Sequence, residues 1–190
     1  MNLNLHRNKK EVEEMLREQH VIETSPEFNS FKQSNPDAFF CSAFFVISAH
    51  DLVEEAQFNY YSPKTKQITT FSLPALNMKQ EKARAKPEEI DTTQIKDIDE
   101  VVLKAKKLIK PLDKLIAILE KTRLPSDNVP NKNNGKDKNG KDKNNQDNKI
   151  STVMWKVTAV LNDLSVAKLF FDARTLELLK QKKEKIFWIM

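Results

Sequence analysis

The side chains that could do chemistry are few and scattered along the chain. The three histidines are His6, His20 and His50, and no two of them have a spacing that would place both on one metal ion. The single cysteine, Cys41, lies in the most apolar stretch, where cysteine usually acts as a small buried hydrophobe. An extended chain from Cys41 to His50 spans about 30 Å, so the two form no dyad without a chain reversal. We therefore expect no catalytic residues, no metal site and no cofactor, and we classify the protein as a non-enzyme.

Two further groups have competing explanations. Residues 50–55 bring together His50, Asp51, Glu54 and Glu55, which could bind a cation, but an exposed loop between strands commonly carries such residues. We favour the loop. Tyr60, Tyr61 and Phe71 could stack on nucleic-acid bases, but the nearby lysines lie at a turn and not on the same face. We therefore predict that these aromatic side chains pack in the core.

Glycine is nearly absent, and this excludes several kinds of site. Gly135 and Gly140 are the only two glycines, and both lie in a polar, low-complexity tract. Phosphate-binding loops, dinucleotide fingerprints and nucleophile elbows need glycine where the backbone approaches a phosphate or turns sharply. None of these motifs can be written on this chain.

Most of the positive charge lies in the same tract. The 190 residues carry a net charge of +5, and residues 131–149 contain six lysines against three aspartates. A segment made only of Asn, Lys, Gly, Asp and Gln has nothing to bury, so we predict a disordered insertion at 125–150. The rest of the chain is close to neutral, which is unlike a nucleic-acid-binding domain with a basic structured face.

Capping residues, helix terminators and apolar residues at helical spacing indicate three helices. We expect them over residues 9–20, from Pro26 to Asn35, and from Asp97 or Asp99 to Pro111.

Strand signals are strongest in two places. Residues 38–48 are apolar on both alternating faces, which is typical of a strand covered on both sides, although a helix is also possible. From Val153 to Leu161 apolar and polar residues alternate strictly. Residues 115–119 form a short apolar run that we interpret as a strand, with a helix over 112–123 as the alternative. Turn-joined strand pairs are expected at 57–61 with 67–73 and at 165–171 with 176–180.

These elements divide the chain into two parts and a connection. We assign residues 1–73 to N-terminal helices plus a three-stranded meander, residues 74–97 to a polar linker, and residues 98–190 to a second part that carries the insertion. The two turn-joined strand pairs, FNYYSPKTKQITTF and AKLFFDARTLELLK, echo each other in pattern. The predicted fold class is α+β, with antiparallel sheets, helices on one face, and two similar helix-plus-meander halves.

Three segments of the second half carry a family resemblance: Trp155-Lys156-Val157, residues 167–175 and Glu177-Leu178-Leu179. These segments resemble the PepSY domain, a small fold in which one helix packs on an antiparallel sheet. They resemble, in order, one strand of that domain, the next strand with its Asp-Ala-x-Thr-Gly turn, and the final strand. The chain also resembles small uncharacterised intracellular archaeal proteins with a PepSY-like C-terminal half. Where the family turn has glycine this chain has Leu176, so we expect either another turn geometry or backbone strain. The resemblance implies a non-catalytic module, associated in other contexts with propeptides and with modulation of proteases.

The carboxyl-terminal residues combine charge with apolar side chains. Four lysines within residues 180–185 precede the apolar segment 186–190. This segment either packs as a closing strand or is an exposed anchor for a partner or an anionic membrane surface; we favour packing, since five apolar residues in water are an aggregation hazard.

Together these features predict a non-enzymatic protein-binding or scaffolding module. Because residues 38–48 are apolar on both faces, we expect the second sheet face to be covered by the other half or by another copy in a homodimer. A groove between the halves would receive a protein or peptide segment or a second copy. The partner-binding candidates are Phe44, Tyr60, Trp155 and Phe170 in this groove, and Phe187 and Trp188 in the terminal segment.

The alternative function is a nucleic-acid accessory protein that uses the Lys/Asn-rich loop and the C-terminal lysines. No apolar run reaches the roughly 18 residues that a membrane span needs, and the first residues lack a signal-type apolar stretch. We therefore expect a cytoplasmic protein.

Overall fold

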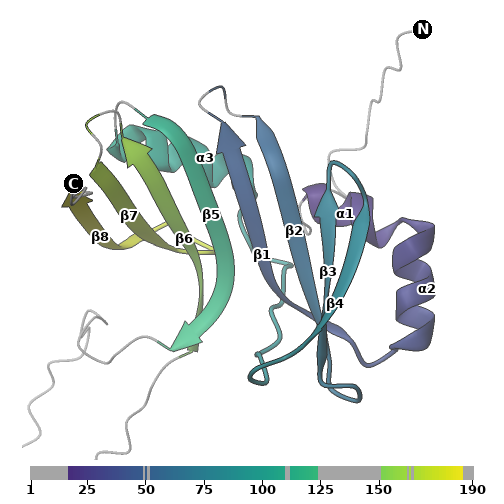
Figure 1. Cartoon of the computed structure of the whole chain (residues 1–190). Coiled ribbons are helices and arrows are strands. Elements are labelled where there is room, and N and C mark those ends of the chain that lie inside the picture. The colour runs from purple at the N-terminus through teal and green to yellow at the C-terminus, as the bar shows by residue number, and fades with distance from the viewer. Residues whose placement is uncertain are drawn as a thin grey trace, which may run out of the picture.

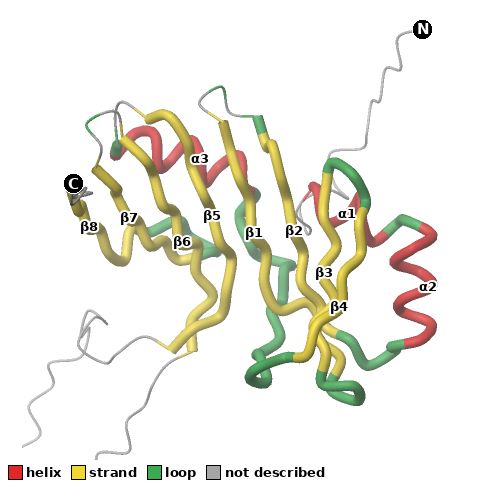
Figure 2. The backbone as a smooth tube through the Cα atoms, viewed as in Figure 1, coloured by secondary structure: helices red, strands yellow, loops and turns green. Residues whose placement is uncertain are grey.

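The computed structural model describes residues 17–48, 50, 52–109, 112–123, 151–161, 163 and 165–185. These residues form a mixed α/β fold that consists mostly of sheet: one antiparallel sheet of eight strands and three helices (Figures 1 and 2). The helices are α1 (Arg17–Glu23), α2 (Pro26–Ser34) and α3 (Ile98–Leu108), and the strands are β1 (Phe39–Ser48), β2 (Val53–Ser62), β3 (Gln67–Leu73), β4 (Asn77–Lys82), β5 (Leu112–Arg123), β6 (Ser151–Leu161), β7 (Ser165–Asp172) and β8 (Leu178–Lys185).

Two four-stranded meanders join to make the sheet. The strand order is β4-β3-β2-β1-β5-β6-β7-β8, so β1 and β5 are adjacent at the centre and β4 and β8 form the two edges. β1 and β5 pair antiparallel from Ser42 opposite Glu120 to Ser48 opposite Lys114. The strand interpretations of residues 38–48 and 115–119 are therefore confirmed over their helical alternatives.

Local capping interactions begin α2 and α3 where the sequence predicts. Ser25 caps α2 by accepting a hydrogen bond from the Phe28 amide at 3.1 Å, and Pro26 occupies the first turn. Asp97 caps α3 by accepting from the Ile98 amide at 2.6 Å. Of the predicted helix 9–20, residues 9–16 lie outside the described residues, and α1 extends three residues beyond its predicted end.

One hydrophobic core holds the helices against one face of the sheet. Phe28 and Phe31 of α2 contact the rings of Tyr60 and Phe71, with ring centroids 4.8–6.2 Å apart. At the centre of the sheet Phe45 packs against Phe58 and Trp155. Residues of α1, α2 and α3 belong to this same core, which spans both meanders, and Figure 1 shows α3 behind β1, β5 and β6.

The prediction that residues 74–97 are only a linker is wrong. Residues 77–82 form β4, a fourth strand that pairs with β3, and all six of its residues are exposed. Because β4 is an edge strand with no apolar alternation, the sequence carries no period-two signal for it. The following residues are packed: Ile90 and Ile95 are buried in the core, and the Ile90 amide donates to the Phe40 carbonyl at 3.0 Å.

The two hairpins that echo each other in sequence hold different places in the sheet. β2 and β3 form the middle hairpin of the first meander, whereas β7 and β8 form the last hairpin of the second. The echo therefore does not superpose equivalent strands, because β4 follows the first hairpin.

The turn between β7 and β8 accepts backbone strain at the position where the resembling family has glycine. Leu176 has a φ of 55°, in the left-handed region, at a cost of about 1–2 kcal/mol for a residue with a Cβ. The Asp172 carboxylate organises the turn by accepting from the amides of Arg174 and Thr175, both at 2.9 Å. The Leu176 side chain is buried, and this burial offsets the strain.

The neighbouring residues Phe44 and Phe45 provide a matched test of the two sheet faces. Phe45 is fully buried, so Phe45→Ala should lower the free energy of unfolding by about 3–5 kcal/mol. Phe44 is half-buried on the opposite face, so Phe44→Ala should cost ~1 kcal/mol at low protein concentration. Denaturant titration of both variants measures the difference, and equal losses would contradict the assignment of faces.

The α1–α3 contact predicts a pH dependence of stability. Burial raises the pKa of Glu18 above its ordinary 4.5, and the negative charges of Asp97 and Asp99 raise it further, against the opposing charge of Arg17. The Glu18 Oε2 atom is buried without a hydrogen-bond partner in the described part of the chain. Since the folded state holds this proton more tightly than the unfolded state, stability falls as pH rises from about 4.5 to the raised folded pKa.

Glu18→Gln should therefore unfold at a higher temperature than the wild type at pH 7, and this difference should shrink below pH 4.5. Thermal unfolding from pH 4 to pH 8 measures it. Glu177→Gln, in the exposed turn before β8, is the control and should leave the pH profile unchanged. A lower melting temperature of Glu18→Gln at pH 7 would mean that the charged carboxylate stabilises the fold.

Candidate functional site

The face of the sheet opposite the helices, here called the helix-free face, is the candidate binding surface. Side chains alternate between the two faces of a strand, and over residues 43–48 of β1, residues 155–161 of β6 and the whole of β7 buried residues alternate with half-buried ones. The half-buried residues form the helix-free face. No helix in the described ranges contributes to this face, since the three helices share the single core on the other side.

Strand register places the residues of this face in rows. Residues directly opposite each other on neighbouring strands lie on the same face, so each row can be followed from β2 to β8. The first row is Gln57, Phe44, Ile118, Lys156, Phe170 and Lys180, and the second is Glu55, Val46, Ile116, Thr158, Lys168 and Lys182.

The centre of the helix-free face is apolar. Phe44 and Val46 of β1 lie opposite Ile118 and Ile116 of β5, and all four side chains are half-buried. Phe170 of β7 adds a further half-buried aromatic side chain two strands away. Contiguous apolar patches are common at interaction surfaces, so these residues form the centre of the candidate binding surface.

Charges are distributed unequally around this centre. On the β2 side are the carboxylates of Glu54, which pairs with Lys114 at 3.0 Å, and Glu55, which accepts from Gln57 at 2.7 Å. All four lysines of the two rows lie on the side formed by β6 to β8: Lys156, Lys168, Lys180 and Lys182.

Two of these lysines are paired and two are not. Lys156 pairs with Glu120, and Lys168 pairs with Glu184 at 2.9 Å. Within the described residues Lys180 and Lys182 have no ion pair, and both are exposed. Among the described residues, the charges of the helix-free face without an ion pair are thus Glu55 on the β2 side and Lys180 and Lys182 on the β8 side, with the apolar centre between them.

The predicted groove lined by four aromatic residues does not exist. Phe44 and Phe170 lie on the helix-free face, but Tyr60 and Trp155 point into the core and are 3% and 0% exposed. The prediction is wrong because alternation along the strands separates these residues onto opposite faces. Phe187 and Trp188 lie outside the described residues.

The polar atoms of the two buried aromatic side chains are used inside the protein. The Tyr60 hydroxyl donates to Glu23 Oε1 at 2.7 Å, and burial beside this carboxylate raises the pKa of the phenol. The Trp155 indole donates to the Lys96 carbonyl at 3.2 Å. Phe71 packs in the core, as predicted, whereas Tyr61 is buried outside that core beside Phe39, with ring centroids 5.5 Å apart.

Three other side chains considered for chemistry, Cys41, Glu54 and Glu55, have partners within the protein. Cys41 is buried, burial raises the pKa of its thiol to about 11, and its Sγ donates to the Asn59 carbonyl at 3.3 Å. In the cluster at residues 50–55, Glu54 and Glu55 have the partners named above, and Asp51 lies outside the described residues. Among the described side chains no group of three or more His, Cys, Asp or Glu residues is arranged to hold a metal ion.

Sequence reasoning missed Val46, Ile116 and Ile118 as surface residues. Each lies in an apolar run, and a run that is apolar at every position gives no signal for which of its two faces the helices cover. The pairing of β1 with β5 would have identified them, because it brings these three side chains and Phe44 together.

No helix in the described part of the chain has both the length and the apolar character that crossing a membrane requires. Comparison of the chain with models of protein families, with curated proteins and with solved structures finds no match.

Proposed function

We propose that the protein is a non-enzymatic protein-binding or scaffolding module that self-associates through the helix-free face. The observation that carries this proposal is the charge pattern of that face: Glu55 at one side, an apolar centre, and lysines at the other side. A surface with this pattern is complementary to a second copy of itself.

The charge pattern selects one of two symmetric ways to stack the faces. Rotation of a second copy about an axis along the central strands places its β2 side over β7 and β8 of the first copy. Glu55 of each copy then faces Lys168 and Lys182 of the other, while Ile116 and Ile118 meet near the axis. Rotation about an axis across the strands would place like charges together, which is unfavourable.

The chosen arrangement agrees with general sheet packing. Two sheets that pack face to face keep their strands within about 30° of each other and lie about 10 Å apart. Rotation about an axis along the strands keeps the strands of the two copies aligned with each other, as this geometry requires.

The face is large enough for a stable interface. Six strands at about 4.8 Å spacing and about 20 Å of strand length give a footprint of roughly 600 Å². The accessible area exceeds this flat footprint because side chains stand out from it, and a standard interface buries about 800 Å² per partner.

The proposed module is PepSY-like and duplicated. Supporting this, α2 is followed by the meander β1 to β4, and α3 by the meander β5 to β8. In this proposal β2 corresponds to β6, and the self-associating face is built from both copies. The expectation of a cytoplasmic location stays with this proposal.

Self-association is tested by the mass of the full chain in solution over a concentration series of about 1–200 μM. We expect the wild type to approach the dimer mass, and Phe44→Ser to weaken the dimer at least tenfold, since it removes an aromatic side chain from the apolar centre. Leu103→Ser is the matched control, because Leu103 is an apolar side chain that is 59% exposed on α3, away from this face.

Three results would contradict the proposal. A wild-type monomer over the whole series would remove self-association. Equal weakening by Phe44→Ser and Leu103→Ser would remove the specificity of the face. Loss of the dimer in a chain that ends at Lys185 but retains Phe44 would assign the contact to residues 186–190.

The alternative, a nucleic-acid accessory protein, has a separate test. Deletion of residues 131–149 removes six lysines and three aspartates. If that tract binds nucleic acid, the full chain should show weak, steeply salt-dependent binding of a single-stranded oligonucleotide, and the deletion should abolish it. We expect no such binding at 150 mM salt and expect self-association to survive the deletion.

A further inference from the structure

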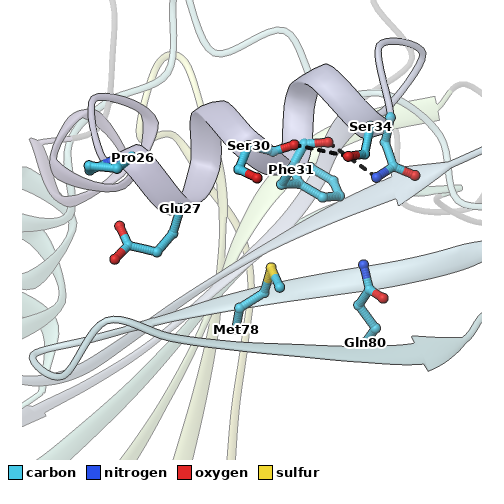
Figure 3. A pocket seen from close by; sticks show the side chains of 8 residues that line it. Pro26, Glu27, Ser30, Phe31, Ser34, Met78 and Gln80 are labelled. Atoms are coloured by element: carbon cyan, nitrogen blue, oxygen red, sulfur yellow. Dashed lines mark hydrogen bonds between the residues drawn. The ribbon is translucent and has the colours of Figure 1, made fainter.

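A groove lies between α2 and the edge strand β4, on the helix side of the sheet and away from the helix-free face (Figure 3). Its volume is about 490 Å³, within the range of sites that bind small ligands and side chains. The groove is lined by Pro26, Glu27, Ser30, Phe31, Ser34 and Asn35 from α2 and its cap, and by Met78 and Gln80 from β4.

The backbone of β4 has unused hydrogen-bonding groups beside this groove. The Ala83 amide donates to the Lys66 carbonyl at 3.0 Å, and β3 and β4 continue from there in unbroken register, with Gln67 opposite Lys82. In an antiparallel pair, hydrogen-bonded residues alternate with residues whose amide and carbonyl groups point away from the partner. Met78, Gln80 and Lys82 therefore direct their backbone groups outward from the sheet.

The side chains of the same residues face α2. Met78 lies opposite the core residue Phe71, and the Gln80 side chain donates to the buried Thr69 hydroxyl at 3.2 Å, so both are on the helix side. Met78 is 53% exposed, an unusual state for a large apolar side chain beside a groove. Outward backbone groups and a partly apolar groove thus coincide on one edge.

The two edges of the sheet differ in their protection against strand addition. β8 carries four lysines in eight residues and a register shift next to Phe171, both of which discourage pairing with another strand. The register of β4 has no shift, and its Lys79 and Glu81 lie on the other face, 3.8 Å apart. Only Lys82 is charged among the β4 side chains on the groove side.

We propose that an extended peptide segment of a partner protein adds to the edge of β4 and inserts alternate side chains into the groove beneath α2. The peptide backbone would bond the outward groups of Met78 and Gln80. An apolar side chain would lie between Phe31 and Met78, and a basic side chain would pair with Glu27, the only charged residue of the lining, which Figure 3 shows at the Met78 end. Strand addition beside a helix is a recurring mode of peptide recognition.

This inference rests on the proposed protein-binding function but uses another surface. If the protein is monomeric and binds the peptide, the self-association is overturned and the β4 site is retained. If the protein is a dimer and binds no peptide, the β4 site is overturned and the self-association is retained.

The test uses the full chain and the peptide acetyl-Thr-Lys-Thr-Leu-Thr-Val-Thr-amide, whose Lys, Leu and Val side chains share one face of a strand. We expect saturable binding by NMR titration, with the largest amide shifts at Met78, Gln80 and Lys82 and on α2. A peptide with the same composition but with Lys, Leu and Val adjacent should bind at least tenfold more weakly. Shifts confined to other strands, or equal binding of both peptides, would overturn the proposal.

A matched pair of variants isolates the backbone contribution. Gln80→Pro removes an amide that β3 does not use, so the β3–β4 ladder is retained, and proline is tolerated on edge strands. Gln80→Thr changes the side chain and keeps the amide. We expect Gln80→Pro to weaken peptide binding at least tenfold and Gln80→Thr less than threefold; equal effects would overturn strand addition.

Two further variants cover the case in which Gln80→Pro fails to fold. Ser30→Trp, on an exposed position of α2, fills the groove and should abolish binding. Glu27→Gln should weaken binding of the lysine-containing peptide by about threefold or more. It should leave unchanged the binding of a peptide with Gln in place of Lys. Unchanged binding by Ser30→Trp would overturn the proposal.

Discussion

The antiparallel pairing of β1 with β5 is the constraint on which the rest of the structure depends. It joins two meanders into one sheet, so the helices of both parts share one core instead of two. Phe45 of β1 lies at this junction and contacts Phe58 of the first meander and Trp155 of the second. A sheet of eight strands buries its helix side more completely than either meander would alone.

The junction also determines the path of residues 83–97. The register of β1 with β5 begins at Ser42, and before it the Phe40 carbonyl accepts from the Ile90 amide. Ile90 and Ile95 then fill the core where the central strands no longer pair, and the Ala173 carbonyl accepts from the Lys96 amide. The connection is therefore part of the core, which fixes α3 relative to β6.

One-sided coverage by helices has consequences for both proposed surfaces. The helices leave the opposite face with an apolar centre between Glu55 on the β2 side and Lys180 and Lys182 on the β8 side, which is what a second copy would match. On the helix side α2 stops short of covering β4, so the edge strand and the helix enclose a groove with free backbone groups. The two surfaces lie on different sides of the sheet, so one protein could use both at once.

Sequence alone determined the elements whose signals are local. Ser25, Pro26 and Asp97 fixed the helix starts through capping, and strict alternation fixed β6, because both depend on residues a few positions apart. At the turn where the resembling family has glycine, Leu176 led us to expect either another turn geometry or backbone strain, and its φ of 55° lies in the left-handed region.

Only the tertiary structure decided which residues lie together. β4 has no alternation, so nothing local marks it, and its pairing with β3 alone makes it a strand. Phe44 and Trp155 were expected in one groove, but the register of β1, β5 and β6 places them on opposite faces. The physical reason is that a one-residue change in pairing moves every side chain of a strand to the other face, and the sequence of one strand does not record its partner.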